Sequence, residues 1–255
     1  MTVAPIGVMD SGVGGISVLR ELQRLLPNED FIYYADHAHC PYGGKSRQAI
    51  VDRTVAITEE LLARGAKLIV VACNTATIAA VEYLRASYPV PFVGMEPAIK
   101  PAVAQTRTGI VGVLATGAAL AGEKFHALVA QHAGGVRIIT QPCPGLVEQV
   151  ERGDLNGPQT RALVEQYTRP LLAAGADVMV LGCTHYPFLK PLIAEVVGPE
   201  VVLLDTGAAV ARQVERVLQR ESLLAVDGRG GVEWLCSGDP QEFAAIRARL
   251  TEFSA

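Results

Sequence analysis

LLARGAKLIVVACNT (residues 61–75) recurs without a gap as LLAAGADVMVLGCTH (residues 171–185). Each copy leads from the end of a helical pattern through a continuous apolar run to a cysteine. Continuous apolarity is typical of strands covered on both faces, as in parallel sheets flanked by helices. The repeat therefore predicts two similar α/β units, with Cys73 and Cys183 in equivalent positions.

Further apolar runs continue this pattern along the chain. The expected strands are residues 6–10, 31–36, 67–73, 92–95, 109–116, 136–142, 177–183, 201–206 and 232–238. Apolar residues at helical spacing lie between them, most clearly in 47–63. The sequence thus predicts an α/β fold of two similar domains, each a mostly parallel sheet flanked by helices, with the active site in the cleft between them.

The expected domain boundary is EPAIKPA (96–102), which two prolines interrupt. The ninth strand is too little for a third domain, so we expect the C-terminal segment to return to the first one. The first domain is then residues 1–96 plus 208–255, and the second is residues 97–207.

Composition narrows the class of protein. Charged residues make up 19% of the chain and the net charge is −4, so we expect no nucleic-acid partner and no acidic membrane surface. The five cysteines are widely spaced, which favours reduced thiols in a cytoplasmic protein. Residues 1–10 do not resemble a signal peptide, and the longest apolar stretch, 109–122, is too short to span a membrane.

Six polar or reactive side chains lie where the expected strands end: Asp10, Asp36, Cys73, Thr116, Cys183 and Asp205. Carboxyl ends of parallel strands line the ligand crevice of such folds. If the two units face each other, the two cysteines approach one ligand from opposite sides. That arrangement suits removal of a proton from one face of a carbon and delivery to the other.

A single cysteine is often only a buried packing residue. Here both members of the matched pair are followed by polar residues, which favours a chemical role. A free thiol with a pKa of about 8.5 is a weak base at neutral pH, so it needs help from the following helix start. Further donors are Asn74, Thr75, Thr184 and His185.

Two polar loops complete the candidate site. MDSGVGG (9–15) places Asp10 and three glycines before a helix expected near Ile16, an arrangement that binds anions, although a plain βα turn explains the glycines equally well. YADHAHCPYGGKS (34–46) offers Asp36, Tyr42 and the Gly43 amide to a ligand.

The same loop invites a metal hypothesis through His37, His39 and Cys40. Zinc spacing is absent, so a solvated loop is the preferred interpretation and no metal is expected. Glu151 is compatible with an ordinary charge on a helix surface.

The chain resembles the glutamate racemases of the aspartate/glutamate racemase family, which work without a cofactor and supply D-glutamate for peptidoglycan. The resemblance runs through GVMDSGVGG, PYG, VVACNTAT, GMEPAIKPA, VLATG, LGCTHYP and LLDTG. It implies an isomerase that acts on glutamate. We expect a cytoplasmic location from the cysteines, and a homodimer because homodimers are common among soluble enzymes.

By this resemblance Cys73 and Cys183 are the two acid/base thiols, one for each direction. Asp10 assists beside Cys73, and His185 and Glu151 assist beside Cys183, while Asp36 matches a carboxylate on the Cys73 side. The residues implied to bind the substrate are Asp10, Ser11, Tyr42, Gly43, Asn74, Thr75, Thr116, Thr184 and His185.

Some positions depart from the family pattern. His37 stands where the family usually has threonine, and Ala119 and Ala121 follow Thr116 where it tends to have threonine and serine. We expect these changes to affect the pocket wall or the dimer contact. The chain also starts close to its first strand, without the extension of members that a peptidoglycan precursor regulates, so such activation is not expected.

Three alternatives remain open. The first is an aspartate or hydantoin racemase of the same fold class. The second is a cysteine hydrolase with Cys183 as nucleophile and His185 as base, which leaves Cys73 idle and requires two side chains that need not meet. The third is a carboxylate-binding protein without catalysis.

Overall fold

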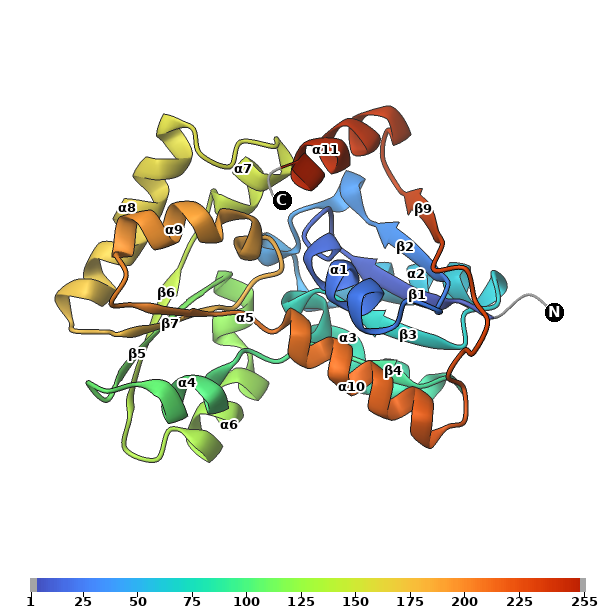
Figure 1. Ribbon diagram of the computed structural model, residues 1–255, viewed down its shortest axis with the longest axis horizontal. Coiled ribbons are helices and arrows are strands. Elements are labelled where there is room, and N and C mark those ends of the chain that lie inside the picture. The colour runs from blue at the N-terminus through green and yellow to red at the C-terminus, as the bar shows by residue number, and fades with distance from the viewer. Residues whose placement is uncertain (1–3, 253–255) are drawn as a thin grey trace.

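Strands form two separate parallel sheets in the computed structural model, which describes residues 4–252 (Figure 1). The first sheet has the order β4-β3-β1-β2-β9, with β1 (Ile6–Asp10), β2 (Phe31–Ala35), β3 (Leu68–Val71), β4 (Phe92–Val93) and β9 (Val232–Cys236). The second has the order β6-β5-β7-β8, with β5 (Ile110–Ala115), β6 (Arg137–Pro142), β7 (Val178–Leu181) and β8 (Val202–Leu204). The expected strands and the α/β class with two parallel sheets are confirmed.

Helices connect the strands and cover the sheets. They are α1 (Ile16–Leu25), α2 (Arg47–Ala63), α3 (Asn74–Ser87), α4 (Ile99–Gln105), α5 (Gly117–Ala121), α6 (Glu123–His132), α7 (Leu146–Glu151), α8 (Pro158–Ala173), α9 (Lys190–Val197), α10 (Gly207–Arg220) and α11 (Pro240–Glu252). Short 3₁₀ helices occupy His37–His39, Tyr42–Gly44 and Tyr186–Leu189. Within residues 4–252, none of these helices combines the length and the apolarity needed to cross a membrane.

Apolar side chains of both faces of each sheet are buried, as the continuous apolar runs require. In the first sheet, Val8 and Val70 face α1 and α10, whereas Met9 and Val71 face α2 and α3. In the second sheet one face packs on α7, α8 and α9, and the other packs on α4, α5 and α6. We call the five-stranded sheet with its helices the first unit, and the four-stranded sheet with its helices the second unit.

Strand register makes the two units equivalent. Met9 of β1 pairs with Val71 of β3, and Leu114 of β5 pairs with Leu181 of β7. These are the last pairs between the two strands of each unit, so Asp10, the final residue of β1, lies beside the turn that carries Cys73. In the same way, the end of β5 lies beside the turn that carries Cys183.

The C-terminal segment lies with the first unit. β9 pairs with β2 in parallel register, and α10 packs on α1. The boundaries that divide the chain into residues 1–96 with 208–255 and residues 97–207 stay a prediction, and their ends at 1–3 and 253–255 lie outside the described residues.

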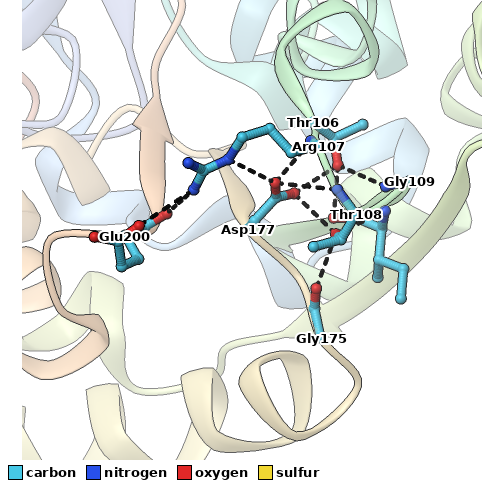
Figure 2. A network of polar contacts seen from close by, with 8 residues as sticks. Thr106, Arg107, Thr108, Gly109, Gly175, Asp177 and Glu200 are labelled. Carbon is cyan, nitrogen blue, oxygen red and sulfur yellow. Dashed lines mark hydrogen bonds and ion pairs between the residues drawn. The ribbon is translucent and has the colours of Figure 1, made fainter.

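A polar network ties the opposite, amino ends of β5 and β7 (Figure 2). The buried Asp177 carboxylate accepts hydrogen bonds from the hydroxyls of Thr106 and Thr108, at 2.5 and 3.0 Å, and from the Arg107 amide at 2.7 Å. These bonds outweigh burial, which by itself raises the pKa, and lower the pKa of Asp177 to about 2. The network fixes the loop that enters β5, far along the sheet from Cys183.

Candidate active site

One small cavity lies where the carboxyl ends of the two sheets meet. Ten residues expected from the sequence line it: Ser11, Tyr42, Gly43, Cys73, Asn74, Thr75, Thr116, Cys183, Thr184 and His185. Pro41, Val147 and Gly182 also line it. Its volume is about 10 Å³, close to the space that one water molecule needs.

Cys73 follows β3 and immediately precedes α3. Its buried thiol donates a hydrogen bond to the Ser11 hydroxyl at 3.8 Å. Burial, followed by the negative charge of Asp10, raises the pKa of Cys73 to about 12, and the Ala76 amide and the Ser11 hydroxyl oppose this only in part. The helix start therefore opposes the rise but does not produce the net lowering of this thiol pKa that the sequence suggested, and the protonated form of Cys73 is favoured at neutral pH.

Cys183 follows β7 and contacts a histidine. The Nδ1 atom of His185 lies 3.7 Å from the Cys183 sulfur, so the two side chains do meet. Burial lowers the pKa of His185, but hydrogen bonds with Cys183, Cys40 and Glu151 outweigh it and raise this pKa well above its usual value. The raised pKa favours the protonated form of His185, whose ring lies in direct contact with the Cys183 sulfur.

Asp10 lies behind the cavity and does not line it. One of its oxygens accepts the Gly12 amide at 2.8 Å, and the other accepts the Thr184 hydroxyl of the second unit at 3.1 Å. Burial raises the pKa of Asp10, and the positive His185 opposes that shift. The carboxyl group therefore connects the two units and positions Thr184.

Asp36 also lies outside the cavity wall. Its oxygens accept the Tyr42 hydroxyl at 2.6 Å and two nitrogens of Arg53 at 2.7 and 3.0 Å, and His39 Nδ1 lies 3.0 Å away. Burial raises the pKa of Asp36, but the hydrogen bonds from Arg53 and Tyr42 outweigh it and lower this pKa. Geometry thus places Asp36 where it holds Tyr42, and a direct catalytic part for it stays a prediction.

Glu151, at the end of α7, is not a free surface charge. Its Oε1 atom lies 2.5 Å from His185 Nε2 and accepts the Val13 amide at 2.8 Å, while Oε2 lies 3.0 Å from His37 Nδ1. Burial raises its pKa, but the bonds from both histidines outweigh this and lower the pKa well below the usual range. The carboxylate is behind the cavity, where it orients His185.

The three residues of the metal hypothesis do not converge, because His37 binds Glu151 and His39 binds Asp36. A different group, Cys40 with Glu151 and His185, brings its ligand atoms within 4.8 Å of one another. The 2.5 Å contact between His185 and Glu151 is a hydrogen-bond distance with a proton between the two atoms.

Hydroxyl and amide groups complete the cavity wall. The hydroxyls of Thr75 and Thr116 meet at 3.0 Å across the two units, and Thr116 also accepts the Ala119 amide at 3.2 Å, which caps α5. The buried Asn74 Oδ1 has no hydrogen-bond partner among the described residues. Ala119 is buried under α6, Ala121 is exposed, and neither lines the cavity.

Sequence reasoning missed some residues of the site. Pro41 and Gly182 lie inside the quoted motifs, so their position could have indicated them. Val147 looks like any other apolar helix residue in the sequence. Arg53, which holds Asp36, carried no signal, and His37 was noticed in the sequence without its partner Glu151, which lies in the other unit.

Comparisons with known proteins identify the family. A model of the Asp/Glu/Hydantoin racemase family matches residues 6–214. The glutamate racemase of Herpetosiphon aurantiacus is 61% identical over 247 residues, which are 96% of this chain and 97% of that protein.

Solved structures agree as well. Escherichia coli glutamate racemase, in complex with L-glutamate and the activator UDP-MurNAc-ala, has a TM-score of 0.85 at 35% identity over 96% of this chain and 95% of its own. Thermus thermophilus glutamate racemase, in complex with β-chloro-D-alanine, has a TM-score of 0.80 at 38% identity over 99% of this chain and 94% of its own. These likenesses, with paired cysteines on one cavity, show that the chain is an enzyme of the Asp/Glu/hydantoin racemase family.

Proposed function

We propose that the protein interconverts L- and D-glutamate by proton transfer between two cysteines, without a cofactor, and supplies D-glutamate for peptidoglycan. One observation carries this proposal: Cys73 and Cys183, from equivalent turns of two units, line the same cavity. A carbon between two opposed thiols loses its proton to one and gains a proton from the other, which inverts its configuration. The relatives named glutamate racemase favour glutamate over aspartate or a hydantoin.

The surroundings of the two sulfurs differ, and this assigns their roles in one direction of the proposed reaction. Cys73 is the proton donor, because burial and Asp10 raise the pKa of its thiol, and Cys183, with His185 Nδ1 at 3.7 Å, is the base. Cys183 then removes the α-proton of one enantiomer while Cys73 delivers its own proton to the opposite face. After this step Cys183 carries the proton and Cys73 is a thiolate. This is the form that removes the α-proton of the other enantiomer.

Polar groups of the cavity provide for the charges of glutamate. The unpartnered Asn74 Oδ1 is an acceptor suited to the substrate ammonium. The hydroxyls of Ser11, Thr75, Thr116 and Thr184 and the Gly43 amide are donors suited to its two carboxylates. A buried site with fixed donors also stabilises the carbanion that proton removal creates.

Glutamate exchange in deuterated water tests this function. We expect wild-type protein, with no added cofactor, to exchange the α-proton of L-glutamate and to form D-glutamate, as followed by NMR and chiral chromatography. Cys73→Ser and Cys183→Ser should each lower racemisation at least about a thousandfold, because a hydroxyl is a far weaker acid/base than a thiol. Exchange of L-aspartate but not L-glutamate, or full activity in either variant, contradicts the proposal.

The contact between Cys183 and His185 keeps a second function testable. The 3.7 Å approach supplies the nucleophile and base of a cysteine hydrolase, which the sequence spacing did not require. Hydrolysis needs only Cys183, so Cys73→Ser would keep activity and an acyl-enzyme would form. Racemisation loses activity in both variants, and no acyl adduct appears by mass spectrometry.

Cellular location and oligomeric state are also part of this proposal. The cysteines at 40, 73, 143, 183 and 236 are free thiols, which suits the reducing cytoplasm where peptidoglycan precursors are made. We further expect a homodimer, which sedimentation velocity at micromolar concentration checks. A monomer at all concentrations would refute this part and leave the chemistry untouched.

A further inference from the structure

His37 takes part in a chain of contacts that ends at the candidate thiol. Its Nδ1 atom lies 3.0 Å from Glu151 Oε2, and the other oxygen of the same carboxylate lies 2.5 Å from His185 Nε2. His185 in turn reaches Cys183 through Nδ1 at 3.7 Å. The carboxylate of the second unit is thus clamped between an imidazole of each unit.

We propose that His37 is a positioning residue for the reaction: it fixes Glu151 so that this carboxylate aims His185 at Cys183. This inference rests on the proposed function. His37 touches neither the cavity nor the thiols, so it acts only through Glu151.

The clamp leaves each carboxylate oxygen with its own task. Oε1 binds His185 and the Val13 amide, whereas the only side chain on Oε2 among the described residues is His37. The Glu151 side chain is 11% exposed, so loss of His37 leaves Oε2 nearly buried without a donor. We then expect the carboxylate to rotate toward water, where Oε2 regains a hydrogen-bond donor. This rotation removes the contact that holds His185 in place.

The charges around the clamp favour the donor form of His37. Glu151 faces its Nδ1 atom, and Glu242 of α11 lies 3.9 Å from its Nε2 atom. The hydrogen bond that His37 donates to Glu151 is the largest influence on the pKa of His37 and raises it, although burial opposes this rise. Cys40, Cys183 and Asp10 face His185 at the other end of the clamp.

Kinetics of two variants test the positioning role. His37→Asn keeps an N–H donor near the Nδ1 position, and His37→Ala removes it. We expect His37→Ala to lower kcat for glutamate about tenfold with little change in KM, because His185 is misaligned but the substrate contacts remain. The kcat of His37→Asn should stay within about threefold of the wild-type value, and the kcat of the matched surface variant His126→Asn should equal the wild-type value.

Titration of the imidazole rings by NMR tests the same clamp independently of catalysis. The chain holds five histidines, so the ring signals can be assigned by single substitutions. We expect the His185 titration to shift measurably in His37→Ala and to remain near wild type in His37→Asn and His126→Asn. Thermal unfolding midpoints of all three variants should confirm that each is folded.

The outcomes separate this inference from the proposed function. If glutamate is not racemised but the His185 titration still depends on His37, the function fails and the clamp stands. If His37→Ala racemises glutamate at the wild-type rate with an unchanged His185 titration, the clamp is overturned while the function stands. Equal loss in His37→Asn and His37→Ala also overturns it, because the retained donor should rescue.

Discussion

At the level of single residues, the sequence pointed to the two cysteines because they form a matched pair at equivalent strand ends. A pair of this kind is harder to explain by packing alone than a single buried cysteine. It could not reveal which buried groups serve them. Arg53 on Asp36 and His37 on Glu151 are partners of ordinary appearance, and only the folded chain brings them together. The downward shift expected for the thiol pKa also failed at Cys73, because the sequence does not show how deeply a side chain is buried.

The glycines of MDSGVGG have a steric reason that the sequence left open. A Cβ atom on Gly14 would overlap the His185 ring and the Thr184 hydroxyl. Gly14→Ala should therefore displace His185 and lower glutamate turnover about a hundredfold in a folded protein, measured by steady-state kinetics with circular dichroism. Gly44, where a Cβ atom would meet nothing within 4 Å, supplies the control, and Gly44→Ala should be unchanged. Equal activity of both variants would disprove this account.

At the level of elements, continuous apolar runs sufficed to predict the strands, because both faces of each sheet are buried. The ends were less accurate: the predicted strand 177–183 ends at Leu181, where Gly182 begins the turn toward Cys183. Apolarity continues past the last ladder hydrogen bond, so it does not mark where a strand stops. The Asp177 network was not predicted, because it joins loops 70 residues apart (177 and 107).

That network makes a prediction about stability. Asp177→Asn should lower the free energy of unfolding by about 2 kcal/mol at pH 7, since the charged acceptor of several hydrogen bonds is lost. The pKa of Asp177 is depressed in the folded protein, so its contribution is full above the usual 3.8 and fades as pH falls toward about 2. Urea unfolding of both proteins at several pH values should show the difference shrinking below pH of about 4. Glu200→Gln, at the exposed end of the network, should change stability little.

At the level of the whole molecule, the repeat predicted two units that face each other, and their contacts are polar as well as apolar. Asp10 with Thr184 and Thr75 with Thr116 bridge the units beside the cavity. The cavity of about 10 Å³ is far too small for glutamate. We therefore expect substrate entry to require separation of the units at these bridges, after which the carboxylates of the substrate would accept hydrogen bonds from the freed hydroxyls.

Separation of the units predicts how the thiols react with a small alkylating reagent. Cys73 and Cys183 are buried, so iodoacetamide reaches them only when the cavity opens, and bound glutamate should block both. At a glutamate concentration of about 100 Kd, their alkylation, followed by peptide mass spectrometry, should slow about a hundredfold. Cys143 is equally buried but does not line the cavity, so its rate should not depend on glutamate. Protection of Cys143 along with the other two would instead indicate general stiffening, and protection of none would mean that glutamate does not occupy the space between the two sulfurs.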